Sequence, residues 1–172
     1  MFQIGDAVVH PAQGAGVVTD IEEFRRRGQD KSYYKIELTS PPRTSVMVPV
    51  DDAQAHGVRE AVSGSRLKRV WCVLTGSPQM LPNDFATRRD AIKDKLSSGK
   101  IRQVAEALRD LAWRRRQEGR LTTTERRLYR KGMNVLAEEI AVARGIDLEA
   151  VKLQVGKRIN EALTRHQGSD VN

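Results

Sequence analysis

Residues 6–24 read DAVVHPAQGAGVVTDIEEF, two runs rich in β-branched residues joined by a turn that contains proline and glycine. Runs of this kind favour strands, and the Pro/Gly segment between them favours a tight connection. Two similar runs follow, KSYYKIEL at 31–38 and RTSVMVPV at 43–50. Four or five short strands in about 50 residues predict a small, strongly bent antiparallel β barrel at the N-terminus.

The last of these runs is expected to be an edge or the end of a strand. Side chains alternate between the two faces along SVMVPV, and Pro49 has no amide hydrogen to donate to a neighbouring strand. An unpaired edge is a natural place for a strand of another protein to dock.

After His56-Gly57 the pattern changes to helices, and the fold class predicted for the whole chain is α+β. Thr122 and Glu125 form a capping-box pattern at the start of the longest helix. The helices are expected after a cap at Ser65, at 84–97, at 100–118, from Thr122 to about Arg144, and from a cap at Asp147 to about Arg165. The predicted organisation is a barrel (1–55), a linker (56–64), an all-α bundle of about five helices (65–166) and a flexible tail (167–172).

The charge of the chain is unevenly distributed. The net charge is +8, and residues 86–131 hold 15 basic against 6 acidic side chains, whereas residues 1–60 hold 7 basic and 9 acidic ones. A concentrated basic excess favours a polyanionic partner such as nucleic acid. The alternative is a basic surface that only contacts solvent.

The sequence lacks the residue patterns of an enzyme or a metal site. His10, His56 and His166 are far apart, and the single Cys72 excludes a Cys-x-x-Cys zinc site. The adjacent Glu138 and Glu139 are interpreted as a solvated helix face. No apolar run approaches membrane-spanning length, and no secretory signal is recognised, so a cytoplasmic protein is expected. We therefore expect a binding protein without catalytic residues, cofactor, metal or small-molecule substrate.

Residues 82–92, PNDFATRRDAI, predict a helix start with Asn83 or Asp84 as the N-cap. Arg88 and Arg89 interrupt the apolar stripe of this helix and separate Phe85 from its core-facing residues. The basic side chains expected to form a phosphate-binding surface are Arg88, Arg89, Lys93, Lys100, Arg114, Arg115, Arg116, Arg126, Arg127, Arg130 and Lys131. Because no sequence-reading motif accompanies them, backbone contact with little base readout is expected.

The motif F-x-I-G-D-A-V-V-H-P-A-Q-G-A-G-V-V resembles the start of the CarD/CdnL family of bacterial transcription regulators. Further matches are VMVPV, HGVRE, the ND-aromatic-x-x-RR stretch, SGK-x-x-x-VAEALRDL and L-x-x-x-ERRLYRKGMNVLAEEIA. The resemblance is collinear over roughly residues 2–145.

The resemblance implies a Tudor-like barrel that binds the β subunit of RNA polymerase. It also implies a helical domain that contacts promoter DNA at the upstream edge of the transcription bubble and stabilises the open complex. By this resemblance the protein is expected to be nucleoid-associated. The implied polymerase-binding residues are Phe24, Arg25, Arg26, Arg27, Ser45, Val46, Met47 and Val48. The implied DNA wedge is Phe85, with Arg88 and Arg89 on phosphates beside it.

Two residues depart from the family pattern. Met47 stands where members tend to have a basic residue, and Phe85 stands where they usually have tryptophan. Because phenylalanine has less stacking area and no indole donor, a weaker wedge is expected. Two other functions stay open at this point: a polymerase-binding adaptor whose helical domain recruits another protein, and a non-specific DNA-compacting protein.

Overall fold

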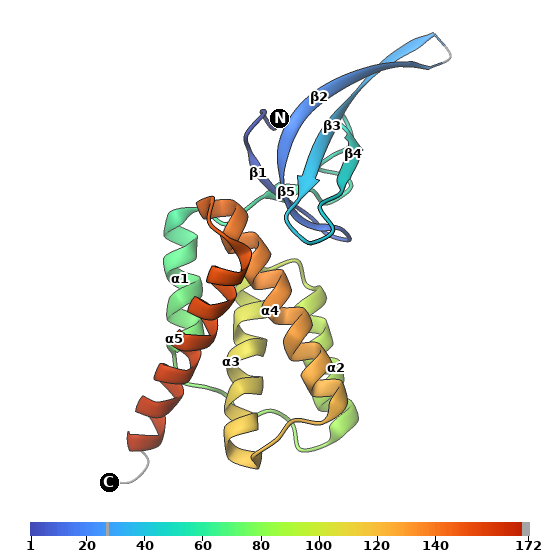
Figure 1. The fold of residues 1–172 in the computed structure, drawn as a ribbon. Coiled ribbons are helices and arrows are strands. Elements are labelled where there is room, and N and C mark those ends of the chain that lie inside the picture. The colour runs from blue at the N-terminus through green and yellow to red at the C-terminus, as the bar shows by residue number, and fades with distance from the viewer. Residues whose placement is uncertain (27, 170–172) are drawn as a thin grey trace. The chain divides into compact units, whose positions relative to one another are not determined.

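The computed structural model describes residues 1–26 and 28–169. The chain divides into two compact units (Figure 1). The first comprises Met1–Val62 and Glu138–Leu148, and the second comprises Ser63–Ala137 and the chain from Glu149 onward. Within the described residues, no helix combines the length and apolar character that a membrane span requires.

The first unit contains a five-stranded antiparallel sheet, as predicted. Its strands are β1 (Ala7–His10), β2 (Gly14–Arg26), β3 (Gln29–Leu38), β4 (Ser45–Pro49) and β5 (Arg59–Glu60). The order β4-β3-β2-β1-β5 places β4 and β5 at the two ends of the sheet, and β2 and β3 form a long hairpin (Figure 1). The predicted linker 56–64 is wrong at Arg59–Glu60, because this segment pairs with β1. A two-residue strand is too short to leave an alternating pattern in the sequence.

Alternation along the strands places one set of side chains in the core of the sheet. Val8, Val18, Tyr34, Ile36 and Val48 are all buried there. The Tyr34 hydroxyl accepts a hydrogen bond from the backbone N–H of Phe2 at 3.0 Å, so this buried phenol has a polar partner.

Gly16, near the start of β2, occupies a position where a side chain would collide with β3. A Cβ atom at this position would lie 2.4 Å from the backbone oxygen of Glu37 and 2.8 Å from a methyl group of Ile36. Only glycine allows β2 to approach β3 this closely.

The helices are α1 (Gly64–Thr75), α2 (Phe85–Ser97), α3 (Ile101–Glu118), α4 (Thr123–Arg144) and α5 (Leu148–Ser169). In the second unit α3 packs against both α1 and α2. Gly132 brings α4 close to its neighbours, because a Cβ there would lie 3.0 Å from Leu96 and 3.1 Å from Leu108. The last residues of α4, from Glu138 on, belong to the first unit.

Two helix boundaries differ from the predictions. The N-cap of α1 is Ser63 rather than Ser65. α5 continues past the expected end at Arg165 to Ser169, so the predicted flexible tail is wrong for residues 167–169, and residues 170–172 lie outside the described chain. Polar residues at the C-terminus suggested a tail, but they are compatible with the exposed face of a helix.

The interpretation of Glu139 as a solvated residue is also wrong. Glu139 is buried, and its two carboxylate oxygens accept hydrogen bonds from the Arg59 guanidinium at 2.7 and 2.9 Å. The backbone N–H of Val62 donates to the same carboxylate at 3.0 Å, and Glu138 accepts from the Ser40 hydroxyl. Within the first unit these contacts attach the 138–148 segment to the end of β5 and to the loop after β3.

Candidate functional site

The start of α2 is fixed by Asp84, the second of the two predicted cap residues. Its carboxylate accepts hydrogen bonds from the backbone N–H and the hydroxyl of Thr87, both at 2.8 Å. These hydrogen bonds lower the pKa of Asp84, so the cap stays ionised at the positive end of the helix dipole. The cap makes Phe85 the first residue of α2.

Phe85 lies at the surface of the helical unit, with 41% of the residue exposed. The guanidinium carbons of Arg88 and Arg89 lie 5.8 and 6.0 Å from its ring centre, at the outer limit of cation–π contact. Arg89 also pairs with its neighbour Asp90, with Nε 2.9 Å from Oδ1. The aromatic ring that the sequence separates from the core is therefore exposed and flanked by two arginines.

Arg88 does not lie on the exposed face that it was expected to share with Arg89 and Lys93; that expectation is wrong. It is 4% exposed, and its Nε donates to Glu125 at 2.6 Å. Its Nη1 donates to the backbone carbonyls of Pro82 and Asn83, each at 2.8 Å. A buried guanidinium with these partners is not available to bind a phosphate. Arg88 instead ties the segment that precedes α2 to the first turn of α4.

The carboxylate of Glu125 accepts hydrogen bonds from three residues. One oxygen accepts from Arg88 and, at 3.1 Å, from Nε of Arg114, while the other accepts from the backbone N–H of Thr122 at 2.8 Å. The backbone N–H of Glu125 donates in return to the Thr122 hydroxyl at 3.2 Å, which confirms the predicted capping box. We call Arg88, Arg114, Thr122 and Glu125 the Glu125 cluster. It joins the beginnings of α2 and α4 to the end of α3.

The pKa of Glu125 reflects two opposing effects. Burial disfavours the charged carboxylate, but the hydrogen bonds from Thr122 and Arg88 outweigh burial and hold the pKa below its usual value. The carboxylate is therefore ionised at neutral pH, and the two arginines beside it compensate its charge.

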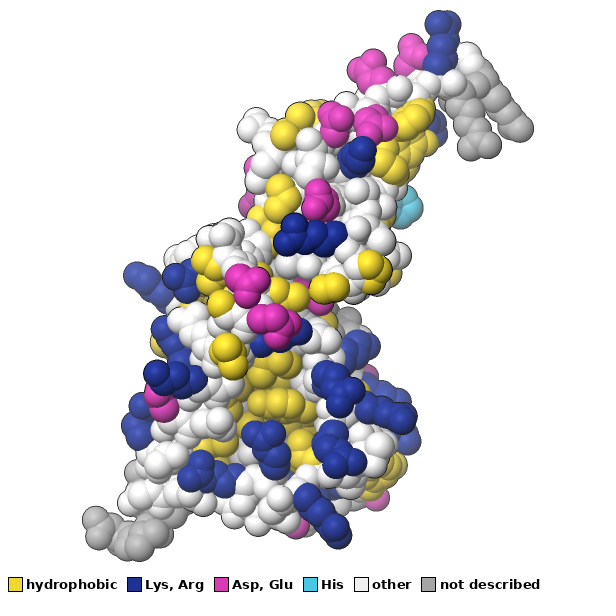
Figure 2. Space-filling view, in the orientation of Figure 1, with side chains coloured by type: hydrophobic (Ala, Val, Ile, Leu, Met, Phe, Trp, Pro, Cys, Tyr) yellow, Lys and Arg dark blue, Asp and Glu magenta, His cyan; other side chains and the backbone are white. Residues whose placement is uncertain are grey.

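The other predicted DNA-binding residues differ in how free their side chains are. Arg114 is occupied by Glu125 and by Glu118, whose oxygen lies 3.6 Å from its Nη1. Arg116 donates to Gln167 at 2.7 Å and Thr164 at 3.3 Å on α5. The other exposed cations of the predicted surface are Lys93, Lys100, Arg115, Arg126, Arg127, Arg130 and Lys131. Figure 2 shows many such Lys and Arg side chains over the helices on one face.

The predicted polymerase-binding residues on β4 divide by strand alternation. Met47 is 38% exposed and Ser45 is also exposed, whereas Val48 is buried opposite Tyr34. Val46 packs against the same core. The side chains of the two valines therefore face inward, and only their backbone groups lie along the strand edge.

The β2–β3 hairpin carries the other predicted residues. Phe24 is 48% exposed and meets the Tyr33 ring edge-on, with ring centres 5.7 Å apart. Arg25 is exposed, and its Nε lies 3.7 Å from Asp30. Arg26 ends β2, but its side chain and the whole of Arg27 lie outside what the structure describes.

Sequence reasoning missed two features of these surfaces. Glu125 was recognised only as half of a capping box, although an acid within a strongly basic segment was a signal that it neutralises buried arginines. Tyr33, which packs against Phe24, was seen only as part of a strand.

Two models of known protein families match most of the chain. Residues 2–62 match the family model described as the CarD-like/TRCF RID domain, a domain class associated with RNA polymerase interaction, and residues 69–155 match the CarD C-terminal domain. A protein of Bacillus subtilis (strain 168), described as "Putative transcription factor YdeB", is 30% identical over 154 residues, which cover 88% of this chain and 98% of that protein. With both domain models matched in order, the chain belongs to the CarD family of transcription factors.

Proposed function

We propose that this CarD-family protein binds the β subunit of RNA polymerase through its N-terminal sheet and promoter DNA through its helical domain. In this proposal the DNA contact lies at the upstream edge of the transcription bubble, and its effect is to stabilise the open complex. The observation that carries the proposal is the exposed ring of Phe85, at the first position of a capped helix and beside two arginines.

Phe85 would act as a wedge in the minor groove. An apolar side chain that enters a base step unstacks it at a cost of a few kcal/mol, and new contacts with the bent duplex offset that cost. Such a wedge must be held rigidly, since a mobile ring would lose conformational entropy on insertion. Asp84 and the buried Arg88 support this requirement, because they fix the backbone on both sides of Phe85.

The phosphate contacts in this proposal come from exposed cations. Arg89 lies beside the ring, and Lys93 and Lys100 follow on α2 and before α3. Each cation that neutralises a phosphate releases counterions, so the affinity for DNA falls as salt rises. Arg88 is left out of this set, because its guanidinium is buried against Glu125. Its role is to position Phe85.

The polymerase contact in this proposal uses the β4 edge and the hairpin. β4 ends the sheet order, so it can accept an added strand through its backbone groups. Ser45 and Met47 point outward from it, and Phe24 and Arg25 lie on the hairpin. The match of residues 2–62 to the RID domain supports this assignment.

The test is the lifetime of the promoter open complex with and without the protein, repeated with Phe85→Ala. A longer lifetime with the intact protein and loss of that effect in Phe85→Ala are expected. If the protein binds polymerase and extends the lifetime equally well without the ring, the helical domain acts as an adaptor for another protein. If it neither binds polymerase nor changes the lifetime, the proposal fails.

A further inference from the structure

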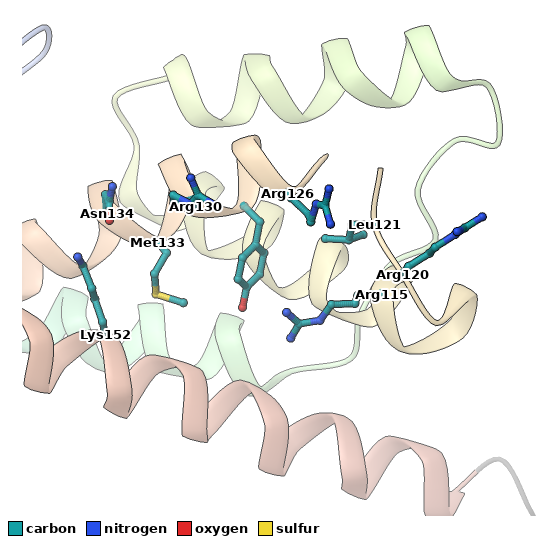
Figure 3. A pocket seen from close by; sticks show the side chains of 9 residues that line it. Arg115, Arg120, Leu121, Arg126, Arg130, Met133, Asn134 and Lys152 are labelled. Atoms are coloured by element: carbon teal, nitrogen blue, oxygen red, sulfur yellow. The ribbon is translucent and has the colours of Figure 1, made fainter. Parts of the chain in front are cut away.

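An open surface pocket of about 690 Å³ lies in the second unit and is lined by residues of α3, α4 and α5. Its lining residues come from the end of α3, the loop before α4, one face of α4, and α5 (Figure 3). They are Arg115, Arg120, Leu121, Arg126, Tyr129, Arg130, Met133, Asn134 and Lys152. We call this surface pocket the arginine pocket. Its volume falls in the range of pockets that hold small ligands.

The spacing on α4 explains how these side chains meet. Arg126, Tyr129, Arg130 and Met133 follow the i, i+3, i+4, i+7 pattern, so they share one face of the helix. Leu128, on the opposite side of α4, is buried. Lys152 extends from α5 toward α4, on the other side of the pocket (Figure 3).

The charge of the arginine pocket is not compensated. No acidic residue is among the nine that line it, and in the described part of the chain no carboxylate lies within ion-pair distance of Arg115, Arg120, Arg126 or Arg130. Only Lys152 has an acidic partner, Glu149 at 2.9 Å. An adjacent cavity of about 590 Å³ shares Arg120 and Arg126 but includes Glu118 and Glu125. The arginine pocket therefore stands out as a site for a multiply charged anion.

The pocket also has an apolar and aromatic part. Tyr129, Met133 and Leu121 line it together with the arginines, and the guanidinium carbon of Arg115 lies 5.3 Å from the Tyr129 ring centre. Burial raises the pKa of Tyr129, and Arg115 is a hydrogen-bond partner of its hydroxyl. Asn134 adds an amide that can both donate and accept a hydrogen bond. Bare phosphate would use only the cations of such a site.

We propose that the arginine pocket binds a free nucleoside triphosphate, with the phosphates on the arginines and the base against Tyr129 and Met133. A guanidinium group can bind a phosphate through two parallel hydrogen bonds to two of its oxygens. Aromatic rings stack on any nucleobase. We assign the occupant a regulatory role, since none of the nine lining residues is an Asp, Glu, His, Cys, Ser or Thr. This inference rests on the geometry of the pocket and does not require that the protein stabilise open complexes.

The test is a fluorescence titration of the intact protein with mant-labelled ATP, without polymerase or DNA. Saturable binding that unlabelled ATP reverses is expected. Arg130→Ala and Arg115→Ala are each expected to weaken it about tenfold, the loss typical of one charge-assisted hydrogen bond. Arg127→Ala is the matched control, since Arg127 is an exposed arginine of the same helix outside the pocket. It is expected to change the dissociation constant less than twofold.

Two further measurements separate a nucleotide from simpler anions. Tyr129→Leu is expected to weaken ATP binding several-fold while leaving displacement by inorganic tripolyphosphate unchanged, because tripolyphosphate has no base. The absence of saturable mant-ATP binding overturns the proposal, as does an equal loss in Arg127→Ala or displacement by tripolyphosphate as efficient as by ATP. Binding of random duplex DNA without any mant-ATP signal would assign these arginines to the DNA surface and also overturn it.

Discussion

The Nε atom of Arg88 donates to Oε1 of Glu125 across 2.6 Å, and both residues are almost completely buried. The pair lies three residues from Phe85 along α2 and within the first turns of α4. Arg88 comes from the most basic part of the sequence, but in this pair it holds the backbone beside the exposed ring of Phe85 in place.

Removing this support should destabilise the helical unit. Arg88→Ala leaves Glu125 buried with Arg114 as its remaining cation, and it leaves the carbonyls of Pro82 and Asn83 without their donor. Loss of one partner of a buried pair typically costs about 3–5 kcal/mol, and we expect the lower end because Arg114 remains. Urea denaturation followed by circular dichroism measures the change.

The matched control is Arg89→Ala. Arg89 is the next residue on α2 and pairs with Asp90, but this pair is exposed to solvent, so Arg89→Ala should destabilise the protein much less than Arg88→Ala. If the two variants lose equal stability, the Glu125 cluster does not hold the start of α2.

The ionisation of Glu125 should appear in the pH dependence of stability. Its pKa is lower in the folded protein than the usual 4.5, so its contribution is complete above that value and is lost as pH falls through the lower, folded pKa. Glu125→Gln keeps the shape but cannot ionise. The difference in unfolding free energy between wild type and Glu125→Gln should therefore shrink below about pH 4.5. A difference that is constant with pH would contradict this assignment.

The order of strands and helices was predicted from local sequence patterns, because each strand or helix depends mainly on residues close together in the chain. The capping box of Thr122 and Glu125 spans three positions, and the alternation along SVMVPV repeats every two residues. The burial of Arg88 could not be predicted this way. Its carboxylate partner is 37 residues away, and only tertiary packing brings the two together.

For the candidate site, too, the local features could be predicted from the sequence and the features that depend on tertiary packing could not. The separation of Phe85 from the core-facing residues of its helix was predicted, although Arg88, one of the two arginines behind that prediction, is itself buried. The inward direction of Val48 follows from strand alternation once its register is known. The arginine pocket was not predicted, since it combines Arg115, Tyr129 and Lys152 from three helices. Their common charge was visible in the sequence, but their convergence was not.

Gly16→Ala should destabilise the sheet. The added methyl group would lie 2.4 Å from a backbone oxygen of β3, and backbone cannot rotate away as a side chain can. Overpacking of this kind typically costs about 1–3 kcal/mol. Gly156→Ala is the control, and it should stabilise the protein. Nothing lies within 4 Å of the added methyl group, and alanine is more favourable than glycine inside a helix such as α5 by about 1 kcal/mol. Thermal melts of both variants give the comparison, and a neutral Gly16→Ala would contradict the close approach of β2 and β3.

Met47 offers a test of the polymerase contact. It is exposed on β4, and the resemblance to the family leads us to expect a basic residue at this position. Met47→Arg should tighten binding to RNA polymerase, and the gain should fall as salt is raised, since exposed charges are screened. Met47→Glu should weaken binding, whereas Met80→Arg serves as control because Met80 is exposed on the loop before α2. Equal affinities for all three variants in a titration of labelled protein with polymerase would exclude β4 from the contact.

Phe85→Trp tests the wedge without removing it. Tryptophan has a larger stacking surface than phenylalanine, and its exposed position on the first turn of α2 leaves room for the indole. An additional 0.5–1.5 kcal/mol of aromatic contact corresponds to an open-complex lifetime roughly 2- to 10-fold longer. Leu153→Ala is the control, because Leu153 is 77% exposed on α5 and its loss should leave the lifetime unchanged. A shorter lifetime with Phe85→Trp, together with unchanged thermal stability, would indicate that Phe85 fits a pocket on its partner that the indole cannot enter.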